Sequence, residues 1–149
     1  MNVLTLDLGT KTGWAMSVEG IICSGTEEFK NSRYSGGGMR FLNFNKWLND
    51  VHRASPIGSV YFEEVRRHMG VDAAHCYGGF LGHLSAWCEV NKIPYQGIPV
   101  GTIKKYATGK GNAKKPEMIA AAQARWPNQR ILDDNQADAL WILATALKL

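Results

Sequence analysis

The sequence predicts an α/β fold in which helices flank a mixed five-stranded sheet. Two observations support this prediction. Three short β-rich segments joined by tight turns open the chain, and strand-like and helical segments alternate after them. The first pattern is typical of an antiparallel meander, and the second of parallel strands joined by helical crossovers. The 149 residues fit one domain, so we expect a single domain over 1–149.

The opening meander has three segments. We expect strands at 2–8, 13–18 and 21–29, because each is short, rich in β-forming residues and bounded by a turn signal. Gly9 ends the first strand, and Glu19-Gly20 forms the turn between the second and the third.

Helices and strands alternate over the rest of the chain. The glycine triplet at 36–38 predicts a turn or helix entry, and apolar residues at helical spacing predict a helix that ends at Ala54. The later elements that we expect are a strand at 59–65, a helix at 71–92, a strand at 93–100, a lysine-rich helix and loop at 101–115, a helix from Pro116 to Trp126 and a helix over 133–149. We summarise the order as βββαβαβαα.

Composition excludes several classes of protein. Hydrophobic residues make up 45% of the chain and charged residues 20%, which argues against disorder. No apolar run approaches the roughly 18 residues of a membrane span, and the N-terminus has no export signal. Three cysteines without a CxxC pair favour a reduced compartment. We therefore expect a cytoplasmic protein with no membrane partner.

Acidic residues lie inside apolar elements. Asp7 is in an apolar strand, Glu63 and Glu64 end another, and Asp138 lies past the first turn of the apolar helix ADALWILATAL. Burying a carboxylate costs free energy unless a cation offsets the charge. Magnesium or manganese is the natural candidate, because hard cations take oxygen ligands and need no cysteine or histidine. For Asp7 alone, a polar strand end beside a turn is the competing interpretation.

Two further acids stand at the start of the last helix. Asp133 with Gln136 three residues later resembles a capping box, so Asp133 is expected to cap the helix. Asp134 would lie in the first turn, where the helix dipole favours an acid whatever its function. Because Asp134 and Asp138 are four residues apart, they share a helix face and are near enough to serve one metal cluster.

Strand alternation separates the adjacent glutamates. Thr5 and Asp7 lie on the less apolar face of the first strand. If the site occupies the less apolar face of both strands, then Glu63 joins Asp7, and Glu64 points the other way. Periodicity alone favours this assignment without excluding Glu64.

Positive charge is concentrated in one segment. The net charge is only +4, but residues 101–116 carry five lysines and no acid. This local positive surface is compatible with a nucleic-acid partner.

Three motifs together resemble the RuvC-like Holliday-junction resolvases. They are LDLGTKTGW (6–14), FEEV (62–65) and ADAL (137–140), and the basic stretch IKKYATGKGNAKKPEM (103–118) resembles the segment that the family places between its fifth strand and the next helix. The resemblance spans most of the chain, and the short opening looks most like the phage branch. A phage-encoded protein would act in the host cytoplasm.

The resemblance implies an RNase H-like fold, a homodimer, and a metal-dependent endodeoxyribonuclease that resolves four-way junctions and other branched DNA in recombination and repair. Phosphodiester hydrolysis would use two Mg²⁺ per active site, with Mn²⁺ as the other candidate. Carried over by position, the metal ligands would be Asp7, Glu63 and Asp138, with Asp134 as the fourth acid.

The same resemblance assigns the basic residues. Lys104 and Lys115 fall on family positions expected to touch the phosphate near the cut. Lys105, Lys110 and Lys114 would add salt-sensitive contacts to the DNA backbone, although a merely solvated face is the competing interpretation.

The sequence departs from the cellular members at two places. Those members often place the helix acids three apart, whereas Asn135 stands three before Asp138 here. They also carry an aromatic residue shortly after the strand glutamate, where this chain has Arg66 and Arg67. We expect these arginines to contact a phosphate or a base.

Some of these residues are compatible with other functions. DLGT also resembles the first phosphate loop of actin-like kinases and ATPases, but those folds need a second domain for which 149 residues leave no room. A nuclease acting on flaps or RNA/DNA hybrids, or a non-catalytic protein that binds branched DNA, would share the residues named above. The histidines and cysteines lack zinc-ligand spacing.

The helix at 71–92 is the expected dimer interface, because it combines small residues with aromatics. Its packing on the chain's own sheet is the competing interpretation.

Overall fold

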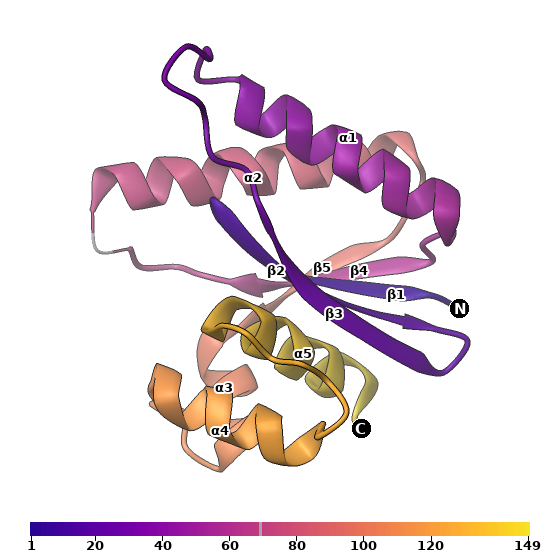
Figure 1. The fold of residues 1–149 in the computed structure, drawn as a ribbon, viewed down its shortest axis with the longest axis vertical. Helices are drawn as coiled ribbons and strands as arrows, with labels where there is room; N and C mark the ends of the chain where they lie inside the picture. Colours follow the sequence, from indigo (N-terminus) through magenta and orange to yellow (C-terminus); the bar gives the residue numbers. More distant parts are fainter. Residues whose placement is uncertain (69) are drawn as a thin grey trace.

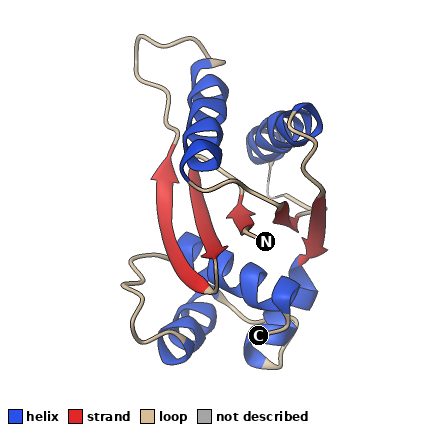
Figure 2. Ribbon diagram, turned by 90° about the vertical axis from the view of Figure 1, so that its right-hand side faces the viewer, coloured by secondary structure: helices blue, strands red, loops and turns tan. Residues whose placement is uncertain are grey.

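In the computed structural model, which describes residues 1–68 and 70–149, a sheet lies between two layers of helices (Figure 1). The strands are β1 (Val3–Asp7), β2 (Lys11–Val18), β3 (Ile21–Glu28), β4 (Ser59–Glu64) and β5 (Tyr95–Pro99). The helices are α1 (Met39–Ala54), α2 (Val71–Val90), α3 (Val100–Thr108), α4 (Lys115–Arg125) and α5 (Asp134–Leu147). Figure 2 shows the layers from the side, with α1 and α2 on one face of the sheet and α3, α4 and α5 on the other.

The sheet is mixed, as the sequence predicts. Its strand order is β3-β2-β1-β4-β5. The first three strands pair antiparallel as a meander, whereas β1 pairs parallel with β4, and β4 parallel with β5. The parallel pairs follow from the helical crossovers α1 and α2, which return the chain to the same end of the sheet before each new strand.

Alternation along the strands creates a core on each face of the sheet. Leu4 and Leu6 pack toward α1 and α2, whereas Val3 packs toward α5. Thr5 lies on the α5 face and is fully buried. Its hydroxyl donates to the backbone carbonyl oxygen of Ala139 at 2.7 Å, so a hydrogen bond joins the central strand to the helix that covers it.

Three helices follow β5. The lysine-rich helix and loop expected at 101–115 correspond to α3 and the loop after it, whereas the summary order βββαβαβαα counts only the two later helices. Gly109 ends α3 with φ +84°, a left-handed conformation that glycine adopts without strain. Among residues 1–68 and 70–149, no helix has the length and apolar character needed to cross a bilayer.

Candidate metal centre

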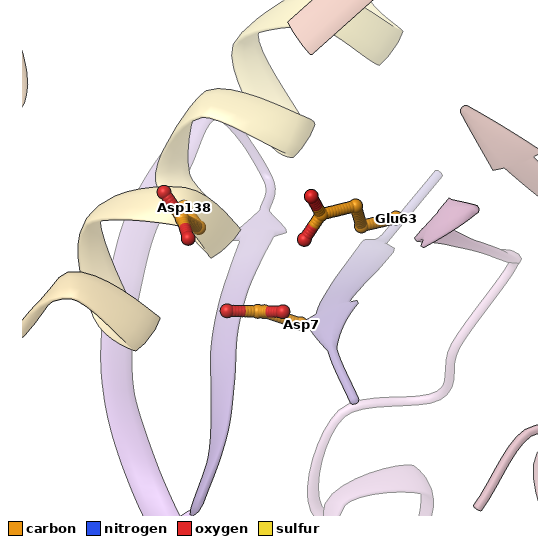
Figure 3. A group of neighbouring side chains, drawn as sticks. All are labelled: Asp7, Glu63 and Asp138. Carbon is orange, nitrogen blue, oxygen red and sulfur yellow. The ribbon is translucent and has the colours of Figure 1, made fainter. Parts of the chain in front are cut away.

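Three carboxylates from distant parts of the chain meet at the end of the sheet. Asp7, Glu63 and Asp138 each offer one oxygen, and these oxygens all lie within 4.8 Å of one another. Figure 3 shows the three side chains pointing toward a common space, two of them from strands and the third from α5.

Strand pairing places the first two carboxylates. Because β1 and β4 are parallel and Leu6 pairs with Phe62, the next residues, Asp7 and Glu63, lie side by side at the carboxyl ends of their strands. Glu64 points to the other face, and its carboxylate accepts from Nε of Arg66 at 3.2 Å. The structure therefore brings Glu63, and not Glu64, to Asp7.

A tyrosine holds the end of β4 in place. The Tyr77 hydroxyl, from α2, donates to the carbonyl oxygen of Glu63 at 2.8 Å and accepts from the backbone N–H of Val65 at 3.2 Å. The strand end that carries Glu63 is thus fixed by a residue from the opposite helical layer.

Three contacts place Asp138. The Asp133 carboxylate caps α5 by accepting from the backbone N–H of Gln136 at 2.8 Å, as expected, and it also accepts from the Thr26 hydroxyl at 2.8 Å. The bond from Thr5 to Ala139 holds the helix one residue beyond Asp138. Third, the backbone of α5 at Asn135 lies close against Gly13, which is the strand partner of Asp7. Helix α5 is therefore fixed to β1, β2 and β3 around the acid.

Burial and mutual repulsion make the carboxylates hard to ionise. Burial, followed by the charges of Glu63 and Asp138, raises the pKa of Asp7 well above its usual range. Burial is also the main reason that the pKa of Asp138 rises to about 7. Burial raises the pKa of Glu63, and this rise is partly offset first by a hydrogen bond with Asp7 and then by the positive charge of Lys104. A cation bound between the three would remove this repulsion and favour their ionised forms.

The donor set fits a hard divalent cation. All three ligand atoms are carboxylate oxygens, which are the ligands that Mg²⁺ and Mn²⁺ take in proteins, and no histidine or cysteine belongs to the group. All three residues are partly buried.

Asp134 lies beside this group but outside it. Its carboxylate is 3.4 Å from the Lys115 ammonium and raises the pKa of Asp138 through its charge. The structure thus pairs the fourth predicted acid with one of the two lysines predicted near the phosphate. The other, Lys104, lies close enough to lower the pKa of both Glu63 and Asp138.

The remaining predicted DNA contacts lie on the surface. Lys105, Lys110 and Lys114 are exposed along α3 and the loop that follows it. Arg66 and Arg67 are exposed just beyond β4. None of these five side chains joins the carboxylates.

Sequence reasoning missed the residues that support the site. Tyr77 gave no distinctive signal, since a tyrosine in a helix is common, and Thr5 indicated only which face of its strand is less apolar. Gly13 did give one, because glycine inside a strand often marks a place where another backbone approaches closely.

Comparison with known proteins identifies the fold. No family model and no curated protein matches this sequence. Among solved structures, T. thermophilus RuvC in complex with a Holliday junction substrate matches with a TM-score of 0.77 and 21% identity, over 97% of this chain and 92% of that chain. A second T. thermophilus RuvC structure matches with a TM-score of 0.74 and 24% identity, over the same shares of 97% and 92%.

A more distant match has the same architecture. Ydc2, the yeast mitochondrial Holliday junction resolvase, has a TM-score of 0.64 and 12% identity, over 96% of this chain and 76% of that chain. At these identities the matches show the fold, and the predicted RNase H-like mixed sheet flanked by helices is confirmed.

Proposed function

We propose that this chain is a metal-dependent endonuclease that cuts branched DNA, with the four-way junction as its main substrate. The observation that carries the proposal is the meeting of Asp7, Glu63 and Asp138 within 4.8 Å, in a chain that shares its fold with RuvC bound to a Holliday junction substrate. The shared fold would explain little without these acids, because one fold can host many functions.

The three carboxylates would hold Mg²⁺, with two ions per site and Mn²⁺ as the other candidate. Bound divalent cations supply Lewis acidity to the attacking water and to the phosphate. Asp134 would join as a fourth ligand by exchanging its contact with Lys115 for the metal. That exchange is feasible because the pair is partly exposed, where ion pairs contribute little to stability.

The lysines and arginines would hold the DNA. Lys104 already lies near Glu63 and Asp138, so it would offset charge on the phosphate being cut, and Lys115 would do so once released from Asp134. The exposed residues Lys105, Lys110 and Lys114 would contact backbone phosphates along the neighbouring duplex.

Arg66 and Arg67 would contact a phosphate or base at the branch point. Both are exposed just past Glu63, and only Arg66 has an acidic partner, Glu64, among the described residues. The short DLGTKTGWA-type opening favours the phage-type branch of the resolvases, which would place the protein in the host cytoplasm.

A homodimer would place two such sites on two symmetric strands of a junction. The outer side of helix α2 supports this part of the proposal. One side of α2 packs on the sheet through Phe80 and Leu84, but Gly78 and Gly82 face open space on its outer side. A second copy could approach closely there.

The test uses purified protein, Mg²⁺ and four labelled substrates of matched sequence: a four-way junction, a flap, an RNA/DNA hybrid and a linear duplex. Symmetric nicking of the junction, with little cutting of the duplex, is the expected result. Equal cutting of junction and duplex would contradict a structure-specific enzyme. Preference for the flap or hybrid would assign the same carboxylates to a different substrate, and junction binding without any cutting would indicate a non-catalytic protein.

A further inference from the structure

A cavity of about 380 Å³ lies between the start of α1 and the start of α2, on the opposite face of the sheet from α5. Its polar lining consists of Arg40 and Asn31 on one side and Asp72, His75 and Cys76 on the other. We call it the Arg40 cavity. None of the proposed metal ligands or DNA-binding residues lines it.

Arg40 lacks the partner that a partly buried arginine normally has. Its guanidinium makes no ion pair with any described acid. Its Nε atom is buried without a hydrogen-bond acceptor, and Nη1 donates only to the Cys76 sulfur at 3.6 Å. Removing such a cation from water costs free energy that a weak sulfur acceptor does not recover. The guanidinium is therefore available to bind an anion that enters the cavity.

The surroundings favour a negative ligand. Residues 29–49 include Lys30, Arg33, Arg40 and Lys46 but no acid. Helix α1 starts at this segment without an acid in its first turn and without a side-chain cap, so the positive end of its dipole is not neutralised there. Asp72 is the one carboxylate in the lining, and it is exposed.

The cavity is close to the carboxylates in the fold. The Thr10 hydroxyl lies 3.6 Å from the same Cys76 sulfur that Arg40 contacts, and Thr10 follows Asp7 by three residues. The Arg40 cavity thus borders the loop after β1 on the α1 and α2 side. The lysines of α3 and α4 approach the same end of the sheet from the α5 side.

We propose that the Arg40 cavity binds a backbone phosphate of the DNA, on the opposite side of the carboxylates from the lysine-rich segment. The DNA would then cross the end of the sheet and contact positive groups on both sides of the cut. Arg40 suits this role because its planar guanidinium can donate two parallel hydrogen bonds to one phosphate. The inference rests on the proposed function for its ligand, although not on catalysis.

The test measures binding of a labelled four-way junction in EDTA, over a range of KCl concentrations, so that no cutting is involved. For Arg40→Gln we expect about a tenfold loss of affinity near 100 mM salt, and a slope of log K against log salt that is smaller in magnitude by about 0.9, the value for one lost phosphate contact. Arg53→Gln is the matched control. Arg53 lies near the other end of α1, is exposed and pairs with Asp50, so this variant should bind like the wild type.

A second variant acts in the opposite direction and does not depend on removing a buried side chain. Asp72→Asn removes the only negative charge lining the cavity, so we expect tighter junction binding by about twofold to threefold. A wild-type salt slope in a folded Arg40→Gln protein, or unchanged binding by Asp72→Asn, would overturn the proposal.

Adding inorganic phosphate tests whether the Arg40 cavity binds a phosphate of the DNA or a free anion. If millimolar phosphate raises the melting temperature of the wild type but not of Arg40→Gln, while both bind the junction equally, the cavity takes a free anion and the DNA assignment is wrong. The two proposals also fail separately. If the wild type binds the junction through Arg40 but does not cut it, only the proposed nuclease function is wrong. If the wild type cuts the junction but binds it no better than Arg40→Gln does, only the proposed phosphate site is wrong.

Discussion

The backbone carbonyl of Asn135 lies directly over Gly13, so close that a Cβ atom on residue 13 would come within 1.8 Å of the carbonyl oxygen. Gly13 is also the strand partner of Asp7, and Asn135 is three residues before Asp138. This single close approach sets the depth at which α5 packs on the sheet. It therefore sets the separation of two carboxylates that come from opposite ends of the chain.

Replacing Gly13 with alanine should damage the site without changing any charged residue. The backbone of Gly13 is not left-handed, so the added methyl acts through its collision with Asn135 and pushes α5 away from β2. We expect a loss of about 2 kcal/mol in the free energy of unfolding, as for an overpacked core, and a large loss of Mg²⁺-dependent cleavage. Urea unfolding and junction cleavage measure the two effects.

Gly36→Ala is the control for this prediction, because nothing lies within 4 Å of a Cβ atom there and its φ is not left-handed. It should leave stability and cleavage close to those of the wild type. Wild-type cleavage by Gly13→Ala would show that the depth of α5 does not control the site.

The two adjacent glutamates provide a matched pair of substitutions. Glu63→Gln removes a carboxylate from the acidic group, so cleavage should fall by more than about 100-fold, since even outer-shell changes at metal sites cost 10- to 100-fold. Glu64→Gln breaks only the partly exposed pair with Arg66 and should change stability by less than about 1 kcal/mol. Mg²⁺-dependent cleavage of the four-way junction, with junction binding in EDTA as the check on folding, measures both variants. Loss of cleavage in Glu64→Gln with full activity in Glu63→Gln would reverse the assignment.

The stability of the metal-free protein should fall as the pH rises. The pKa of Asp138 is about 7 in the folded protein, because of burial first and then the charges of Glu63 and Asp134, against about 3.9 for an unfolded chain. The folded state therefore binds more protons than the unfolded state between these values. The stabilising contribution of protonated Asp138 is complete below about pH 4 and is lost as the pH rises through about 7.

Urea unfolding in EDTA from pH 4.5 to 8 measures this dependence, and Asp138→Asn should make it shallower. Adding Mg²⁺ should stabilise the wild type increasingly as the pH rises, because only ionised carboxylates bind the cation. Identical pH profiles for the wild type and Asp138→Asn in EDTA would contradict the prediction.

The lysines of the basic segment should fall into two kinds. Lys105→Gln and Lys110→Gln should each weaken junction binding and reduce the magnitude of the salt slope by about 0.9, with the cleavage rate at saturation unchanged. Lys104→Gln should also slow cleavage at saturation, because Lys104 lies near Glu63 and Asp138. Lys92→Asn is the control, since residue 92 is exposed beyond the far end of α2 and asparagine tolerates its left-handed backbone. Equal cleavage rates at saturating junction for Lys104→Gln and Lys105→Gln would contradict the proposed difference between these two lysines.

Much of the architecture is visible in the sequence, because strand and helix periodicities are local properties. The β-rich opening predicts the meander, and the alternation of Thr5 and Asp7 with leucines predicts which face of β1 carries the acidic site. The same parity argument favours Glu63 over Glu64, and the structure places Glu63 beside Asp7. The end of α5 at Leu147 and the short helix α3 were less accurately predicted, since helix ends depend on capping and packing.

The sequence by itself therefore determined the fold class, the acid-bearing elements and the strand face on which Asp7 and Glu63 meet. Only the tertiary structure decided that Asp134 turns to Lys115, and that Arg40 has no acid partner among the residues that the structure describes. The physical reason is that these relationships depend on how closely whole elements pack. The approach of α5 to Gly13 and of α2 to α1 is set by side chains far apart in the sequence, and no local pattern records it.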